Sequence, residues 1–229
     1  MKLSLIFISV FLLQVACKGP QKMNYHDRYV NGNTLISTIN PKIMIEANQE
    51  FRYIGYFDFE IKANSDEYPA EYLGKKVADS YRFVFANADK NIKIRKLFIV
   101  QFEGFLPKNN FKYNYNFDAA ENIGNIKYRH NTWFYDNEKN VKENPGIEGA
   151  KTLKFLYSKG YILEPDFMMS RYVGLASEDR KNEIIIFYIE MLKNSTGYSL
   201  YQYENYINKD KSDSIRKDFI SRSKNSFII

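Results

Sequence analysis

The fold is decided by residues 81–105, which read YRFVFANADKNIKIRKLFIVQFEGF. In the first part of this stretch aromatic side chains occupy every second position, which is the pattern of a half-buried strand. The polar turn at residues 87–91 separates it from a second alternating run over residues 92–105. Two alternating runs joined by a short polar turn predict an antiparallel hairpin. Because the second run is apolar on both faces in its middle, we expect a central strand with helices covering one side.

Similar patterns outside this hairpin predict further strands and a few helices. We expect strands at residues 43–45, 51–62, 111–117 and 198–206, and a second hairpin at 171–176 and 183–192. We expect helices at residues 65–79, 148–159 and 213–227, the last of them basic and amphipathic, and a long polar connection at 122–149. The predicted fold class is therefore α+β, with a single antiparallel sheet built from hairpins and packed with a few helices including a C-terminal one.

The N-terminus has the composition of an export signal. Lys2 supplies a basic start, an apolar run follows over residues 3–13, and Ala16 stands directly before Cys17, the only cysteine in the chain. A basic tip, a short apolar segment and a small residue at the cleavage site are typical of a signal peptide. The apolar run is too short for a lasting membrane anchor, which needs about 20 residues.

The end of this signal, Gln14-Val15-Ala16-Cys17, resembles the lipobox of bacterial lipoproteins, where signal peptidase cuts before a cysteine that then carries lipid. Ala16 and Cys17 match the lipobox, Val15 is acceptable, and Gln14 stands where leucine is preferred. The resemblance covers the first 17 positions and implies lipidation of Cys17, with palmitate among the acyl groups, and a location in the cell envelope, anchored to a bacterial membrane. The alternatives are an ordinary secretion signal and a buried N-terminal strand.

The domain organisation follows from this reading. We expect a signal peptide at residues 1–16, a lipid-anchored flexible tether at 17–40, and a single α+β domain at 41–229. The tether is polar and contains Gly19-Pro20 and Asn31-Gly32-Asn33 as turn signals. The rest of the chain has no linker rich in Pro, Ser or Gly, which favours one domain.

Composition excludes several classes of function. The net charge of +6 comes from lysines and arginines scattered among nearly as many acids, so we expect a mixed solvated surface and no nucleic-acid partner. After Cys17 the chain has no thiol, which excludes thiolate zinc sites and cysteine nucleophiles. The histidines and acids lack metal-ligand spacing, and we expect neither a metal nor a cofactor.

Three residues are catalytic candidates. Glu103 follows a long apolar strand, where burial would raise the pKa of its carboxyl and suit it to acid catalysis. Glu190 lies in a similar apolar run, and His130 lies among polar residues in the predicted connection, where it could act as a base. The alternatives are that the glutamates pair with arginines, such as Glu103 with Arg171, and that His130 is an ordinary loop residue.

Aromatic side chains are the candidates for ligand binding. The chain has 19 Tyr, 18 Phe and one Trp, and exposed rings on a sheet can stack on sugars or contact peptides. The alternative is core packing combined with biased codon use. The ligand-binding candidates are Tyr113, Tyr115, Trp133 and Arg171, and further rings to consider are Tyr201 and Tyr203.

These observations favour a binding or scaffolding lipoprotein over an enzyme. The predicted partners are the membrane, through the lipid on Cys17, and an envelope glycan or protein. The second hypothesis is an envelope glycan-directed hydrolase or transferase that uses Glu103, Glu190 or His130. The third is attachment to a membrane surface through the basic C-terminal helix.

Overall fold

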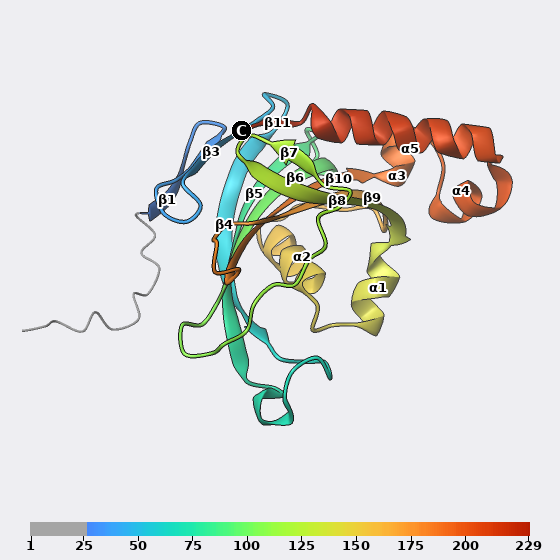
Figure 1. The fold of residues 1–229 in the computed structure, drawn as a ribbon. Helices are drawn as coiled ribbons and strands as arrows, with labels where there is room; N and C mark the ends of the chain where they lie inside the picture. Colours follow the sequence, from blue (N-terminus) through green and yellow to red (C-terminus); the bar gives the residue numbers. More distant parts are fainter. Residues whose placement is uncertain (1–26) are drawn as a thin grey trace, which may run out of the picture.

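The structure is a computed structural model that describes residues 27–229. The predicted signal peptide and Cys17 therefore lie outside the described residues. Within them the strands form two antiparallel sheets, of seven and four strands (Figure 1). The seven-stranded sheet has the order β4 (Arg52–Lys62), β5 (Lys76–Ala88), β6 (Ile94–Phe105), β10 (Asn182–Met191), β9 (Asp166–Leu175), β8 (Ile126–Asp136) and β7 (Glu121–Ile123).

The predicted hairpin at residues 81–105 is confirmed. Strands β5 and β6 pair antiparallel, with Arg82 opposite Gln101. The turn between them is fixed by Asp89, whose carboxylate accepts hydrogen bonds from the backbone of Asn91 and Lys93 at 2.9 and 3.1 Å. Strand β6 lies inside the sheet between β5 and β10, as its apolar faces predicted. The second hairpin is also confirmed, as β9 and β10.

The prediction of a single sheet is wrong, because a second sheet covers one face of the first. Its strands run in the order β1 (Arg28–Asn31), β2 (Thr34–Ser37), β3 (Ile43–Ala47) and β11 (Phe227–Ile228). The predicted tether is therefore wrong for residues 28–37, which form a hairpin in which Leu35 is fully buried. The turn signal read as tether is the hairpin turn, where Gly32 has a φ of 60°.

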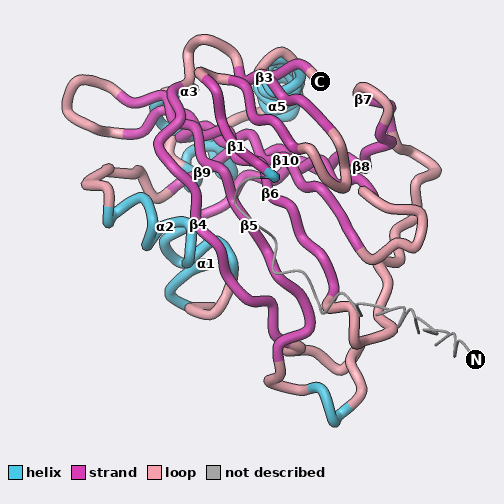
Figure 2. The backbone as a smooth tube through the Cα atoms, turned by 90° about the vertical axis from the view of Figure 1, so that its left-hand side faces the viewer, coloured by secondary structure: helices cyan, strands magenta, loops and turns pink. Residues whose placement is uncertain are grey.

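Two cores lie on opposite faces of the seven-stranded sheet. One face, which includes Phe98 and Tyr188, packs against the small sheet and against α5 (Lys209–Lys224). The other face, which includes Ile99 and Ile185, packs against α2 (Glu148–Ser158). Figure 2 shows α1 (Asn137–Glu143) and α2 together on one side of the long strands. Helices thus cover both faces, whereas the sequence predicted them on one.

Several local predictions need correction, and the helices at α2 and α5 are confirmed. Residues 111–117 form an extended loop, because the backbone of Tyr113 pairs only with Arg180. Residues 198–206 form a helix, α4 (Leu200–Tyr206), since Ser199 and Gln202 make a capping box at its start. It follows the short helix α3 (Leu192–Thr196).

The two remaining corrections concern polar stretches. Residues 122–149 are not a long connection, because they contain β8 and then α1 (Asn137–Glu143), whose first turn is capped by Asp136. Residues 65–79 contain only a 3-10 turn at Ala70–Tyr72 before β5 begins. Within residues 27–229 the structure has no helix long and apolar enough to cross a membrane.

Candidate functional site

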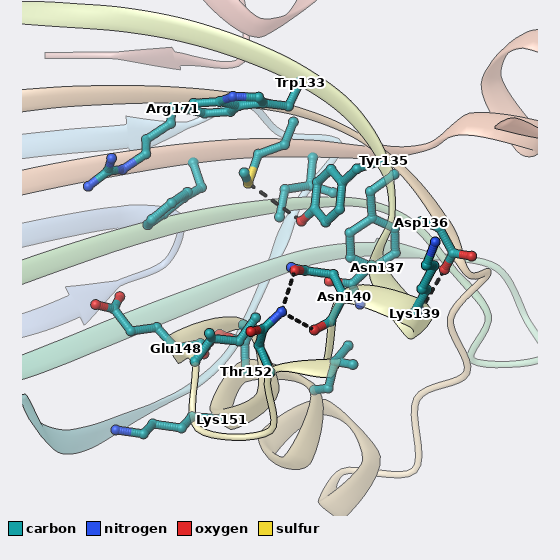
Figure 3. A pocket seen from close by; sticks show the side chains of 18 of the residues that line it. Trp133, Tyr135, Asp136, Asn137, Lys139, Asn140, Glu148, Lys151, Thr152 and Arg171 are labelled. Atoms are coloured by element: carbon teal, nitrogen blue, oxygen red, sulfur yellow. Dashed lines mark hydrogen bonds between the residues drawn. The ribbon is translucent and has the colours of Figure 1, made fainter. Parts of the chain in front are cut away.

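A large cleft lies between the seven-stranded sheet and helices α1 and α2. Its volume is about 1680 Å³, and Figure 3 shows the sheet residues on one wall and the helical residues on the other. We refer to it below as the cleft. Its lining includes Arg82, Leu97, Ile99, Trp133, Met169, Arg171 and Phe187 from strands, and Asn137, Asn140, Glu148, Lys151, Thr152 and Leu153 from the helices.

The strand register places Trp133 and Arg171 together on the sheet wall. Trp133 is opposite Met169, and Asn131 is opposite Arg171, so Trp133 and Arg171 are diagonal neighbours on one face. Figure 3 shows their side chains next to each other along the wall. The indole of Trp133 is 39% exposed, which is high for so large an apolar ring and leaves its surface open to a ligand.

A buried arginine fastens α2 to the sheet. Arg82 is only 4% exposed and donates to Gln101 Oε1 from Nε at 2.5 Å. Its two Nη atoms donate to Thr152 Oγ1 and Glu148 Oε2, each at 2.5 Å. Burial lowers the pKa of Arg82, and the carboxylate of Glu148 opposes that shift. The positive charge of Arg82 is therefore already paired inside the protein.

Behind this network two carboxyl groups face each other across neighbouring strands. Glu103 and Glu183 are directly opposite in β6 and β10, and they are 8% and 2% exposed. Burial, together with the charge of Glu148, raises the pKa of Glu103 to about 7, and burial, together with the charge of Glu103, raises the pKa of Glu183 to about 8. We call these two residues the acid pair.

The acid pair is held by tyrosines from the loop at residues 106–120. Tyr113 donates its hydroxyl to Glu103 at 2.8 Å, and Tyr115 donates to Glu183. Gln101 Nε2 lies 2.8 Å from Glu103 and 3.1 Å from Glu148, which connects the acid pair to the wall of the cleft. Glu183 Oε2 is buried without a hydrogen-bond partner in the part of the chain that the structure describes.

The three catalytic candidates are not brought together. Glu103 is on the α2 side of the sheet, whereas Glu190 and His130 are on the opposite side. None of the three is among the residues that line the cleft.

Glu190 and His130 each have structural partners. Arg222 donates to both oxygens of Glu190 at 2.8 and 2.9 Å, and against the effect of burial this hydrogen bonding lowers the pKa of Glu190. The ring of His130 stacks on Tyr172 at 4.3 Å, with Nε2 3.1 Å from Ser170 Oγ. Burial lowers the pKa of His130, which keeps the ring neutral.

The ligand-binding candidates separate into two groups. Trp133 and Arg171 line the cleft, and so does Tyr201, which is 63% exposed. Tyr113 and Tyr203 are each 8% exposed and take part in packing and hydrogen bonding. Tyr115 is partly buried against Glu183, so its hydroxyl is occupied.

Sequence reasoning missed the residues that surround the acid pair. Arg82 and Gln101 were not named as site residues, and Glu183 marked only the start of a strand. The sequence did contain a signal for Gln101 and Glu103. In a strand predicted to be central, these polar side chains lie on a covered face and must find buried partners. Thr152 and Glu148 gave no such signal.

No group of three or more His, Cys, Asp or Glu side chains within residues 27–229 is arranged to hold a metal ion. No protein-family model, curated protein or solved structure matches the chain. The chemistry of the site therefore has to be argued from its own residues. They provide an apolar floor, an exposed indole and the guanidinium of Arg171, and this combination suits binding.

Proposed function

We propose that this chain is a lipid-anchored, extracytoplasmic binding protein of a bacterial cell envelope, and that the cleft is its ligand site. The observation that carries the binding role is the cleft itself, which has an apolar floor and both Trp133 and Arg171 on its wall. Ligand sites are concave and mostly apolar, with a few placed polar groups, and the cleft has this composition. The envelope location is supported by the resemblance of residues 14–17 to a lipobox.

Binding accounts for the geometry better than catalysis does. An acid–base mechanism needs titratable groups within hydrogen-bond reach of a substrate. Glu103, Glu190 and His130 lie outside the lining of the cleft and on two faces of the sheet. The glycan-directed hydrolase or transferase therefore gains no support from the arrangement of these residues.

The envelope location is tested by metabolic labelling with a clickable fatty acid. We expect label on the wild-type protein and none on Cys17→Ala. The matched control is Gln14→Leu, which supplies the residue that the lipobox prefers and should keep the label. An unlabelled wild-type protein would contradict lipidation and leave Cys17 an incidental residue.

The binding role is tested through Trp133, the only tryptophan in the chain. Because its indole lines the cleft, a bound ligand should change its fluorescence emission. Fractionated envelope extracts are added to the purified protein, and Trp133→Phe identifies signals that come from the extract alone. If no fraction alters the emission, and native mass spectrometry shows only unliganded protein, the binding role is refuted.

A further inference from the structure

We propose that the cleft takes an anionic amphiphile, whose carboxylate or phosphate head is bound by Arg171 and whose apolar chain lies along the floor. This inference rests on the proposed function, because it names the ligand class of the same cleft. It follows from three features: the unpaired guanidinium of Arg171, the apolar side chains that line the cleft, and the partial protonation of the acid pair.

The guanidinium of Arg171 is available to a ligand. It lines the cleft, and no hydrogen bond or ion pair ties it within residues 27–229. Its guanidinium lies over the ring of Phe187, whose centroid is 6.0 Å from Cζ, and its charge acts at longer range on Glu183 and Tyr115. Arg82 lies 5.1 Å from the same ring but is paired with Glu148. A planar guanidinium binds a carboxylate or phosphate through two parallel hydrogen bonds, so an oxyanion would satisfy Arg171.

The floor of the cleft suits an apolar chain. The period-two pattern of β6, β9 and β10 directs one row of side chains from each strand into the cleft. The volume of about 1680 Å³ exceeds the roughly 300–1,000 Å³ of a typical small-molecule pocket, so a long ligand fits. Among the apolar side chains that line the cleft, Met169 is partly exposed and Trp133 is 39% exposed. The packed base beneath them is at most 9% exposed and consists of Leu97, Ile99, Leu153, Leu156 and Phe187.

The acid pair, which lies behind the sheet wall of the cleft, only partly offsets the positive charge of Arg171. The acid pair faces Arg171 from β6 and β10, and its pKa values of about 7 and 8 mean that it is partly protonated near neutral pH. The other titratable or charged groups acting on the acid pair are Arg82, Glu148, Lys151, Tyr68, Tyr113 and Tyr115. Glu148 is bound to Arg82, and none of the other described carboxylates that line the cleft forms an ion pair with Arg171.

The test compares three ligands that differ only in the charge of the head. Dodecanoate, dodecanol and dodecylammonium are titrated below their micellar concentrations, and Trp133 fluorescence reports binding to the purified protein. We expect dodecanoate to bind at least about 10-fold more tightly than dodecanol, a difference typical of one charge-assisted contact, and dodecylammonium to bind weakest. Dodecyl phosphate forms a fourth arm. Tighter binding of either anion than of the alcohol supports the proposal. Whether the phosphate or the carboxylate binds more tightly then indicates a phospholipid or a fatty acid as the source of the ligand.

Variants at Arg171 isolate the head-group contact. Arg171→Gln should bind dodecanoate no better than dodecanol, and Arg171→Lys, which keeps the charge but loses the fork, should fall in between. The matched control is Arg52→Gln, which removes an exposed arginine on edge strand β4, away from the cleft, and should leave all affinities unchanged. Near-ultraviolet circular dichroism of each variant verifies that it is folded.

The outcomes distinguish this inference from the proposed function. Equal affinities for the three ligands would overturn the inference and leave the cleft as a binding site without anion selection. An unchanged emission with all amphiphiles, together with a response to another envelope fraction, would overturn the inference alone. An unchanged emission with every ligand and every fraction would overturn both.

Discussion

Replacing Glu183 by Gln should make the protein more stable at alkaline pH. The acid pair is buried, and its ordinary carboxyl pKa of 4.5 is raised to about 7 in Glu103 and about 8 in Glu183. The folded protein therefore binds more protons than the unfolded chain above the ordinary pKa. The resulting stabilisation is complete below the unfolded pKa and is lost as pH rises through the folded values. The free energy of unfolding should fall across this interval.

The size of the fall follows from the pKa values. Each pKa unit corresponds to about 1.4 kcal/mol, so between about pH 6.5 and pH 9 Glu183 should cost about 2 kcal/mol and Glu103 about 1 kcal/mol. This window lies above the titration of His130, whose pKa is lowered from 6.5 by burial, and below that of the buried tyrosines. In Glu183→Gln the charge repulsion disappears, while the hydroxyl of Tyr115 still has an acceptor. The fall should therefore shrink to less than about 1 kcal/mol.

The assay is urea unfolding of the purified protein, followed by the emission of Trp133, at several pH values within this window. The matched control is Glu178→Gln, which removes an exposed carboxylate from the turn between β9 and β10 and should keep the wild-type pH dependence. A wild-type stability that is flat or rises over the window would refute the reasoning. So would a Glu183→Gln variant with the wild-type slope.

Four further predictions follow from the same contacts. Arg82→Met should lower the free energy of unfolding by about 3 kcal/mol in urea titrations, because it leaves Glu148 and Gln101 without their buried partner. Gly174→Ala should cost about 1–3 kcal/mol by the same measurement, since its Cβ would lie 2.6 Å from Ile126 Cγ2. Glu190→Gln should cost about 2 kcal/mol near neutral pH, and the difference from wild type should close as pH falls below 4.5, where the lowered pKa of Glu190 no longer contributes. In titrations followed by Trp133 fluorescence, dodecanoate should bind the wild-type protein more weakly as pH rises from about 6.5 to about 9, because ionisation of the acid pair places negative charge behind Arg171. The Glu183→Gln variant should show a smaller change in affinity over the same pH range.

The parts of the fold that the sequence predicted are those set by local patterns. The β5–β6 hairpin has period-two alternation and a turn closed by Asp89, and both are visible over a short window. The second sheet was missed because its closure pairs Phe227 with Ala47, two residues far apart in the sequence. The helix α4 was missed because a stretch rich in tyrosine, with Tyr201 and Tyr203 two positions apart, was read as a strand, whereas the capping box at Ser199 determines the outcome.

The sequence predicted those residues of the candidate site whose own side chain suggests ligand binding. Trp133 and Arg171 were named because an exposed ring and a cation are recognisable individually, and the β8–β9 register then places them on one wall. The acid pair could be named only in half, as Glu103, because its partner comes from a strand about 80 positions later in the chain. Cross-strand pairs of this kind depend on register, which the sequence pattern alone leaves open.

The face of the sheet that packs against α2 has an apolar part and a polar part, and the two are covered differently. Where the face is apolar, as at Leu97 and Ile99, α2 packs on it directly. Where it carries Gln101 and the acid pair, a helix packed in the same way would bury polar groups without partners, at a cost of about 1–3 kcal/mol each. The loop at residues 106–120 covers that part instead and supplies tyrosine hydroxyls to it. Arg82 and Glu148 line the cleft and are both hydrogen-bonded to Gln101, so the cleft lies next to the polar part of this face.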